Sequence, residues 1–187
     1  LPHIMSGVTI TRCEVWVTNK RGNFEQARNI VAFMDLGEGV RIDNPYWVPN
    51  GYVLQPDNAV NSLYDEVKAL NGVRDIQSCN STLDAAYNAY EIFGGQDYEK
   101  IESARRLEPS EYTLNTQLGF ISLRQALNND EVLAVAFEYT YNGKTYQVGE
   151  FSTDGIDAPK TLIVKLLKGT ATSPQTALWD LMMKNVY

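Results

Sequence analysis

The sequence predicts an α+β fold in which a mostly antiparallel, sandwich-like β-sheet carries a helical insertion and a C-terminal helix. Strand patterns occupy residues 9–36 and return after residue 111, whereas helical spacing lies between them. Strands and helices that segregate along a chain are typical of α+β domains. With 187 residues, 44% of them hydrophobic, the chain is long enough for one domain with a substantial core. We expect residues 1–6 to be an expression scar and residues 7–187 to form a single soluble domain, with the helical insertion at about 57–107.

β-branched and aromatic residues predict two N-terminal strands. Residues 9–18 alternate between two faces, with Val15 and Val17 on one face and Trp16 on the other. Residues 29–36 are apolar on both faces, as a central strand should be.

The loop at residues 37–56 carries three aromatic side chains, Tyr46, Trp47 and Tyr52. They have two interpretations. They form either a platform that stacks on a sugar or a partner protein, or an anchor that pins the loop onto the core of the domain.

Three helices are predicted after this loop. Residues 60–70 show apolar side chains at helical spacing, and Asn71-Gly72 supplies the stop. A second helix is predicted from Thr82, as its N-cap, to Gly94. A third is predicted from about Asp97 to the residue before Pro109, because the residue that precedes a proline disfavours the helical conformation.

Asn142-Gly143, between two alternating runs, predicts a two-residue type I′ hairpin. The predicted register pairs residue 141 with 144, 139 with 146 and 137 with 148. Further strands are predicted at residues 118–123 and 161–167. Ser173-Pro174 predicts the start of a C-terminal helix. The inward face of that helix is expected to hold Ala177, Leu178, Leu181 and Met182.

The sequence lacks the residues that most enzyme sites need. Its only histidine is His3, so neither Ser-His-Asp nor Cys-His catalysis nor a histidine zinc site is expected. No glycine motif for phosphate or dinucleotide binding occurs. A glycosidase needs only two carboxylates, but the hairpin register predicts Glu138 and Glu150 on opposite faces. We therefore expect no enzymatic activity, no cofactor and no metal.

Charge and composition exclude two further classes. The net charge is −7 and the acidic and basic residues are well mixed, so the concentrated basic surface of a nucleic-acid-binding protein is not expected. No stretch reaches the ~18 consecutive apolar residues of a membrane-spanning helix. Cys13 and Cys79 form either one disulfide or two free buried thiols.

Several long stretches of the sequence resemble the SprA (Sov) family. They read EVWVTN at 14–19, RNIVA at 28–32, PDN leading into NSLY at 56–64, YTLNTQLGFIS at 112–122, DEVLAVA at 130–136, EYTYNG and YQVGEF at 138–151, and WDLMMKNVY at 179–187. The resemblance covers essentially everything after Ser6, and residues 72–95 show least of it.

The resemblance implies that the chain is a soluble fragment of a very large outer-membrane β-barrel, the translocon of the type IX secretion system of Bacteroidetes. Proteins of this family pass folded cargo to the cell surface and support gliding motility. A non-catalytic structural or interaction domain is implied, on the extracellular rather than the periplasmic side, because long loops of such barrels face outward. The implied partners are the rest of the barrel, other type IX components and exported cargo proteins.

Two alternatives stay open. Trp179 and Met183 lie on the outer face of the predicted C-terminal helix. They are either buried on all sides or form a seam with the barrel wall or a neighbouring subunit. The alternative function is a carbohydrate-binding β-sandwich module at the cell surface, which the aromatic loop suggests.

Overall fold

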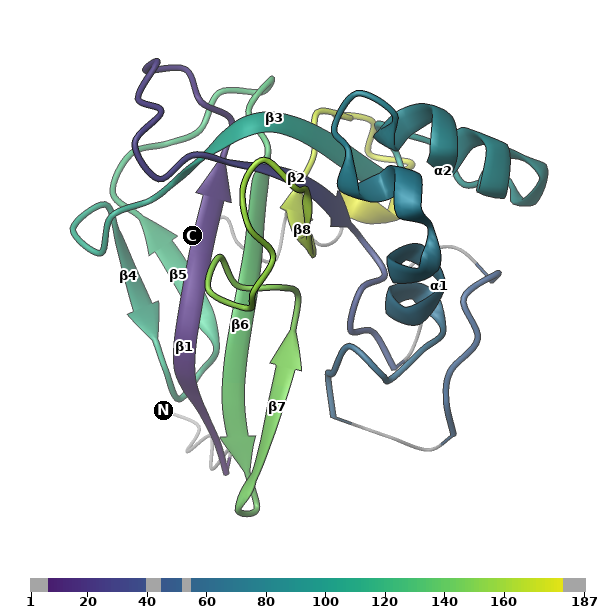
Figure 1. The fold of residues 1–187 in the computed structure, drawn as a ribbon. Helices are drawn as coiled ribbons and strands as arrows, with labels where there is room; N and C mark the ends of the chain where they lie inside the picture. Colours follow the sequence, from purple (N-terminus) through teal and green to yellow (C-terminus); the bar gives the residue numbers. More distant parts are fainter. Residues whose placement is uncertain (1–6, 40–44, 52–54, 180–187) are drawn as a thin grey trace.

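The computed structural model of the chain describes residues 7–39, 45–51 and 55–179, and its main feature is a closed β-barrel (Figure 1). Five strands follow one another around the barrel in the order β1-β3-β2-β8-β6, and β1 pairs with β6 to close it. β7 extends the sheet beyond β6, and β4 and β5 form a separate hairpin. The strands are β1 (Val8–Val17), β2 (Arg28–Phe33), β3 (Tyr98–Arg106), β4 (Tyr112–Asn115), β5 (Phe120–Leu123), β6 (Leu133–Tyr141), β7 (Lys144–Val148) and β8 (Leu162–Lys168).

The α+β class is confirmed, but the predicted sandwich is wrong. In a sandwich, two sheets with free edges pack face to face. Here β1 is paired on both sides, with β6 along its whole length and with β3 at Trp16 and Val17. The pairings are antiparallel except that of β2 with β8. Both architectures bury one face of each strand, so the alternation of side chains could not separate them.

Trp16 occupies the interior of the barrel. Its side chain is fully buried, and the strands around it contribute small side chains: Ala32, Ala104, Ala134 and Ala136. A barrel of so few strands has a narrow interior, so large and small side chains must alternate there. Phe151, from the β7–β8 loop, and Leu178, from the C-terminal segment, complete the same cluster.

Two covers lie over different sides of the barrel (Figure 1). The helical segment comprises α1 (Leu63–Ala69), η1 (Asn71–Arg74), α2 (Cys79–Tyr87) and η2 (Asn88–Tyr90). It packs on the outward side chains of β2 and β8, where Leu63 and Leu83 join Phe33 and Ile163 in one cluster. The β4–β5 hairpin packs on β1 and β6 instead, through residues such as Tyr112 and Leu123.

The third predicted helix is wrong, because its residues form β3. The helical insertion therefore ends near Tyr90 and does not extend to residue 107. A β-bulge explains the error. Residues 28 and 30 of β2 pair with residues 104 and 101 of β3, so β3 has one extra residue there, and Ser103 adopts a φ of 48°. The bulge puts Ile101 and Ala104, three residues apart, on the same interior face, which imitates helical spacing.

The other helices form close to the predicted positions with shifted ends. α2 begins at Cys79 after Ser78, so Thr82 lies inside the helix and is not its N-cap. α1 ends at Ala69 with Leu70 as its C-cap, directly before Asn71-Gly72 as predicted, and Asn71-Gly72 then opens η1. Gly72 is needed there because a β-carbon would collide with the Thr82 side chain. In the C-terminal segment, residues 177–179 are helical and Leu178 is buried as predicted, whereas Leu181 and Met182 lie outside the described residues.

The β6–β7 hairpin is confirmed with its predicted register. Tyr141 pairs with Lys144, and the pairs that follow match residue 139 with 146 and 137 with 148. Asn142 and Gly143 both have positive φ, 48° and 74°, as a type I′ turn requires. The rings of Tyr139 and Tyr146 stack across the two strands with centroids 5.2 Å apart, which adds a side-chain contact to the backbone pairing on one face of the hairpin.

We predict that Gly143→Val lowers the free energy of unfolding by about 1–3 kcal/mol. A β-carbon at Gly143 would meet no neighbour within 4 Å, so the cost arises from the positive φ alone. Thr145→Val is the matched control, because it places the same side chain two residues away in extended backbone and should change stability by less than about 0.5 kcal/mol. Urea unfolding of both variants provides the measurement. Equal stabilities would show that the turn conformation carries no strain.

Candidate functional site

The aromatic loop does not offer a flat platform to a ligand. Trp47 is 1% exposed and belongs to the core beneath the helical segment. Its ring makes edge contacts with Phe33 and Tyr87. Tyr46 is half-buried and lies against Trp47, Tyr87 and Tyr90, with its ring centroid 4.2 Å from that of Tyr90. Trp47 therefore pins the loop to the core, and Tyr52 lies outside the described residues.

Trp179 follows the buried Leu178 and is itself half-buried. Part of its indole therefore remains accessible at the surface. Met183, its predicted companion on the same helix face, lies outside the described residues. The structure thus brings together neither the three loop aromatics nor the Trp179–Met183 pair as one site.

Glu150, one of the two carboxylates considered for catalysis, is fully engaged in a buried network. Arg74 donates to both of its oxygens, each at 2.7 Å, and the Tyr64 hydroxyl donates at 3.0 Å. The backbone N–H of Ile163 donates to Oε2 at 2.7 Å. Burial, and secondarily the Glu150 charge, raises the pKa of Tyr64, so the phenol keeps its proton.

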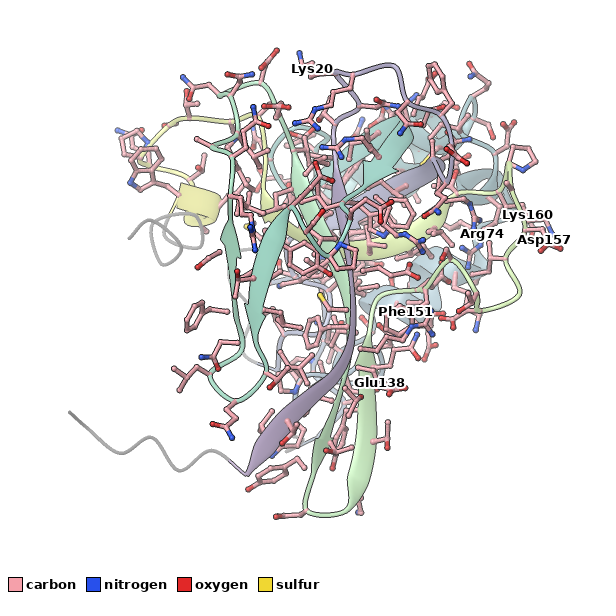
Figure 2. The ribbon with its side chains drawn as sticks, turned by 90° about the vertical axis from the view of Figure 1, so that its left-hand side faces the viewer. Lys20, Arg74, Glu138, Phe151, Asp157 and Lys160 are labelled. Carbon is pink, nitrogen blue, oxygen red and sulfur yellow. The ribbon has the colours of Figure 1, made fainter. Side chains whose placement is uncertain are left out.

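This network connects the helical segment to the barrel. Tyr64 comes from α1 and Arg74 from η1, and Arg74 also exchanges hydrogen bonds with the backbone of Thr161 next to β8. Figure 2 shows Arg74 at the edge of the molecule near Asp157 and Lys160 of the β7–β8 loop, well apart from Glu138 on β6. Glu138 accepts a hydrogen bond from Thr11 at 2.7 Å. The two carboxylates share no partner and do not face one reaction site.

A second buried carboxylate, Glu14 on β1, holds the β7–β8 loop. It accepts hydrogen bonds from the backbone N–H and the hydroxyl of Ser152, at 2.9 and 2.8 Å, and it pairs with Arg12 and Arg106. The Arg12 guanidinium also lies 3.8 Å from the centre of the Phe151 ring, a cation–π contact. Phe151 (labelled in Figure 2) is thereby fixed between the barrel interior and this charged layer.

The buried Arg28 holds the same loop from β2. Its guanidinium donates to the carbonyl oxygens of Ser152, Ile156 and Lys160. Burial lowers its pKa, but arginine stays charged in proteins. Glu14, Arg28 and Glu150 together hold the β7–β8 loop against the barrel at several points. Each of these charges therefore has a structural task.

Both cysteines are free thiols, which settles the alternative left open by the sequence. Burial raises the pKa of Cys13 to about 12 and that of Cys79 to about 11. Both thiols are therefore protonated at neutral pH, and a protonated thiol is a poor nucleophile and metal ligand. Within the described ranges, no three His, Cys, Asp or Glu side chains gather as a metal site would need.

Large apolar side chains remain exposed at the turn of the β4–β5 hairpin. Leu118 is 48% and Phe120 44% exposed, and the turn between them approaches Ile10 of β1. We call Ile10, Leu118 and Phe120 the hairpin-tip patch. Phe120 pairs with Asn115 and so shares the outward face of the hairpin with polar residues. The alternation of residues 120–123 is visible in the sequence. Without a predicted β4 strand as its partner, however, the sequence did not indicate that Phe120 faces outward from a hairpin.

Comparison with protein-family models and with curated proteins gives no match. Among the described residues, no helix is both long and apolar enough to cross a membrane.

We predict that Arg74→Met lowers the free energy of unfolding by about 3–5 kcal/mol, because Glu150 would stay buried without its guanidinium partner. Glu150→Gln should cost less, since the Arg74 side chain is 20% exposed and that of Glu150 only 2%. The control is Asp130→Asn at the Lys20–Asp130 pair, which should have the smallest effect because both side chains are exposed and water screens their attraction. Chemical denaturation ranks the three variants. If Arg74→Met changed the free energy of unfolding no more than the control does, the Glu150 network would not stabilise the contact between the helical segment and the barrel.

Proposed function

We propose that this chain is a non-catalytic structural and interaction domain of a SprA-type outer-membrane translocon of the type IX secretion system. It would support protein export to the cell surface and gliding motility. Its proposed location is the outer membrane and cell surface, on the extracellular rather than the periplasmic side. The proposed partners are the rest of the translocon barrel, other type IX components and exported cargo. No nucleic acid is among them.

The observation that carries the proposal is where the family-like stretches lie in the fold. They supply most of β2, β6 and β7 and the C-terminal end of β1 with Trp16, together with Glu150 and Phe151 that fasten the β7–β8 loop. The stretch at 112–122 forms β4, its turn and most of β5. Residues 72–95, which resemble the family least, form η1, α2 and η2 on the outside of the barrel. The resemblance therefore follows the scaffold and the hairpin.

The hairpin-tip patch is the surface through which we propose contact with the rest of the translocon. Its three side chains are apolar, and the two exposed ones, Leu118 and Phe120, lie in the family-like stretch at 112–122, whereas Ile10 is half-buried. Exposed apolar side chains that gather in one place typically mark a contact surface. The buried carboxylates, in contrast, are bound to arginines and backbone N–H groups, which favours a scaffold over a catalyst.

We predict that Leu118→Lys combined with Phe120→Lys impairs cargo secretion without unfolding the domain. Both side chains are exposed, so each replacement should change stability by less than about 0.5 kcal/mol, whereas two charges would oppose burial in an apolar contact. The melting temperature of the isolated chain and the secretion of cargo by cells with the full-length translocon are measured. Phe24→Lys is the control, since Phe24 is 69% exposed and outside the patch. Normal secretion with the double variant would refute this surface.

A second prediction concerns Trp179. If its exposed part forms a seam with the translocon, Trp179→Ala should cost the isolated domain less than the about 3–5 kcal/mol of a buried tryptophan, yet reduce secretion. Leu178→Ala, next to it in the core, should destabilise the domain by about 2–5 kcal/mol. Thermal unfolding and a cellular secretion assay separate the two effects. A large stability loss with Trp179→Ala would make it a core residue.

A further inference from the structure

Residues of α2, of the start of β3 and of the segment between them line a groove. Figure 1 shows α2 on the side of the barrel that the helical segment covers. The volume of the groove is about 380 Å³, which is at the lower end of small-molecule sites. We call it the α2–β3 groove. It is separate from the hairpin-tip patch, which belongs to the opposite cover of the barrel, and none of its residues takes part in the Glu14 or Glu150 networks.

The helix wall of the groove is a row of short polar side chains. Asn80, Asp84 and Asn88 follow each other at intervals of four residues, so they share one face of α2 and its continuation. In the described part of the chain, the Asn80 and Asn88 side chains have no hydrogen-bond partner. Asp84 accepts a bond from the Tyr98 hydroxyl at 3.0 Å, which fixes its carboxylate and leaves the second oxygen available.

The opposite wall is aromatic and open. Phe93 is 39% exposed, and the two residues after it are glycines. A β-carbon at Gly95 would meet nothing within 4 Å, so no neighbouring group blocks the groove at that point. A ligand in the groove would therefore lie between an aromatic ring and a row of amides and a carboxylate.

The charges at the groove do not favour an ionic ligand. Glu99 is already bound to Thr170, through the backbone N–H at 2.9 Å and the hydroxyl at 2.6 Å. Lys100 donates to the carbonyl of Ile76 and to Glu102. Asp84 carries the remaining charge, which opposes phosphate or other anions. The free groups are the two amides, each of which both donates and accepts hydrogen bonds.

We propose that the α2–β3 groove binds a neutral saccharide. Amide groups and one carboxylate match ring hydroxyls, which also donate and accept, and the exposed Phe93 ring offers an apolar face to the C–H groups of a sugar. The few placed polar groups beside an aromatic wall are the usual composition of a small-ligand site. The site differs from the loop platform suggested by the sequence, because Trp47 of that platform is buried.

The test uses the purified 187-residue chain with neutral hexasaccharides of glucose, xylose, mannose and N-acetylglucosamine, first on an array and then by calorimetry. Phe93→Ala should weaken binding about tenfold and Asn88→Ala about three- to tenfold. Tyr90→Ala is the control for Phe93, because Tyr90 is an exposed aromatic that does not line the groove, and it should bind like the unchanged chain. Melting temperatures check that each variant is folded.

Three results would overturn the proposal. They are failure of every neutral hexasaccharide to bind at about 10 mM, where even a weak site would be occupied, unchanged affinity in Phe93→Ala and Asn88→Ala, and preference for uronic or sulfated oligosaccharides. These binding measurements do not depend on secretion in cells. Their failure would therefore leave the proposed translocon role untouched, because the secretion assay tests that role separately.

Discussion

The pairing of β1 with β6 is the constraint on which the rest of the structure depends. β1 is the first strand of the chain, and β6 is the last barrel strand in the sheet order. The two strands pair along the whole of β1. Once this pairing closes the barrel, the interior has room for one large indole, that of Trp16, beside alanines on three neighbouring strands. The strands also carry apolar side chains on their outward faces, such as Val31, Phe33 and Ile163. They therefore require covers, which the helical segment and the β4–β5 hairpin provide.

Closure also limits the exposed strand edges. β7 remains at the end of the sheet, and its outer edge is partly occupied by the segment before α1. The Asn58 backbone N–H donates to the carbonyl of Gln147. The Asn58 side-chain amide donates to the Gly149 carbonyl, and its side-chain oxygen accepts from the Gly149 N–H. The Tyr139 hydroxyl reaches the carbonyl of Pro56. An edge protected in this way is a poor template for aggregation.

The buried charges hold the loops, and this affects how function is assigned. Glu14 and Glu150 are both buried, and in an enzyme such carboxylates would be candidates for proton transfer. Here each accepts hydrogen bonds from a backbone N–H group and pairs with arginine, so its oxygens are occupied by the scaffold. The two surfaces that we propose for interaction are the hairpin-tip patch and the α2–β3 groove. Because they belong to different covers of the barrel (Figure 1), a partner at one leaves the other accessible.

Local sequence determined those parts of this protein whose signals lie within a few residues. The β6–β7 hairpin was predicted with its register, because only a type I′ turn suits Asn142-Gly143 between two alternating strands. α1 and the strands β1, β2 and β8 were also found from periodicity.

Tertiary structure alone decided the closure of the barrel, since pairing of β1 with β6 joins residues more than a hundred positions apart. It decided β3 as well, where a bulge at Ser103 serves the pairing with β2 and disguises a strand as a helix. It decided that Trp47 is core, because the exposure of an aromatic loop depends on what packs against it. The candidate groove followed the same rule: its polar wall is ordinary helix surface in the sequence and becomes a site only where β3 brings Tyr98 within reach of Asp84.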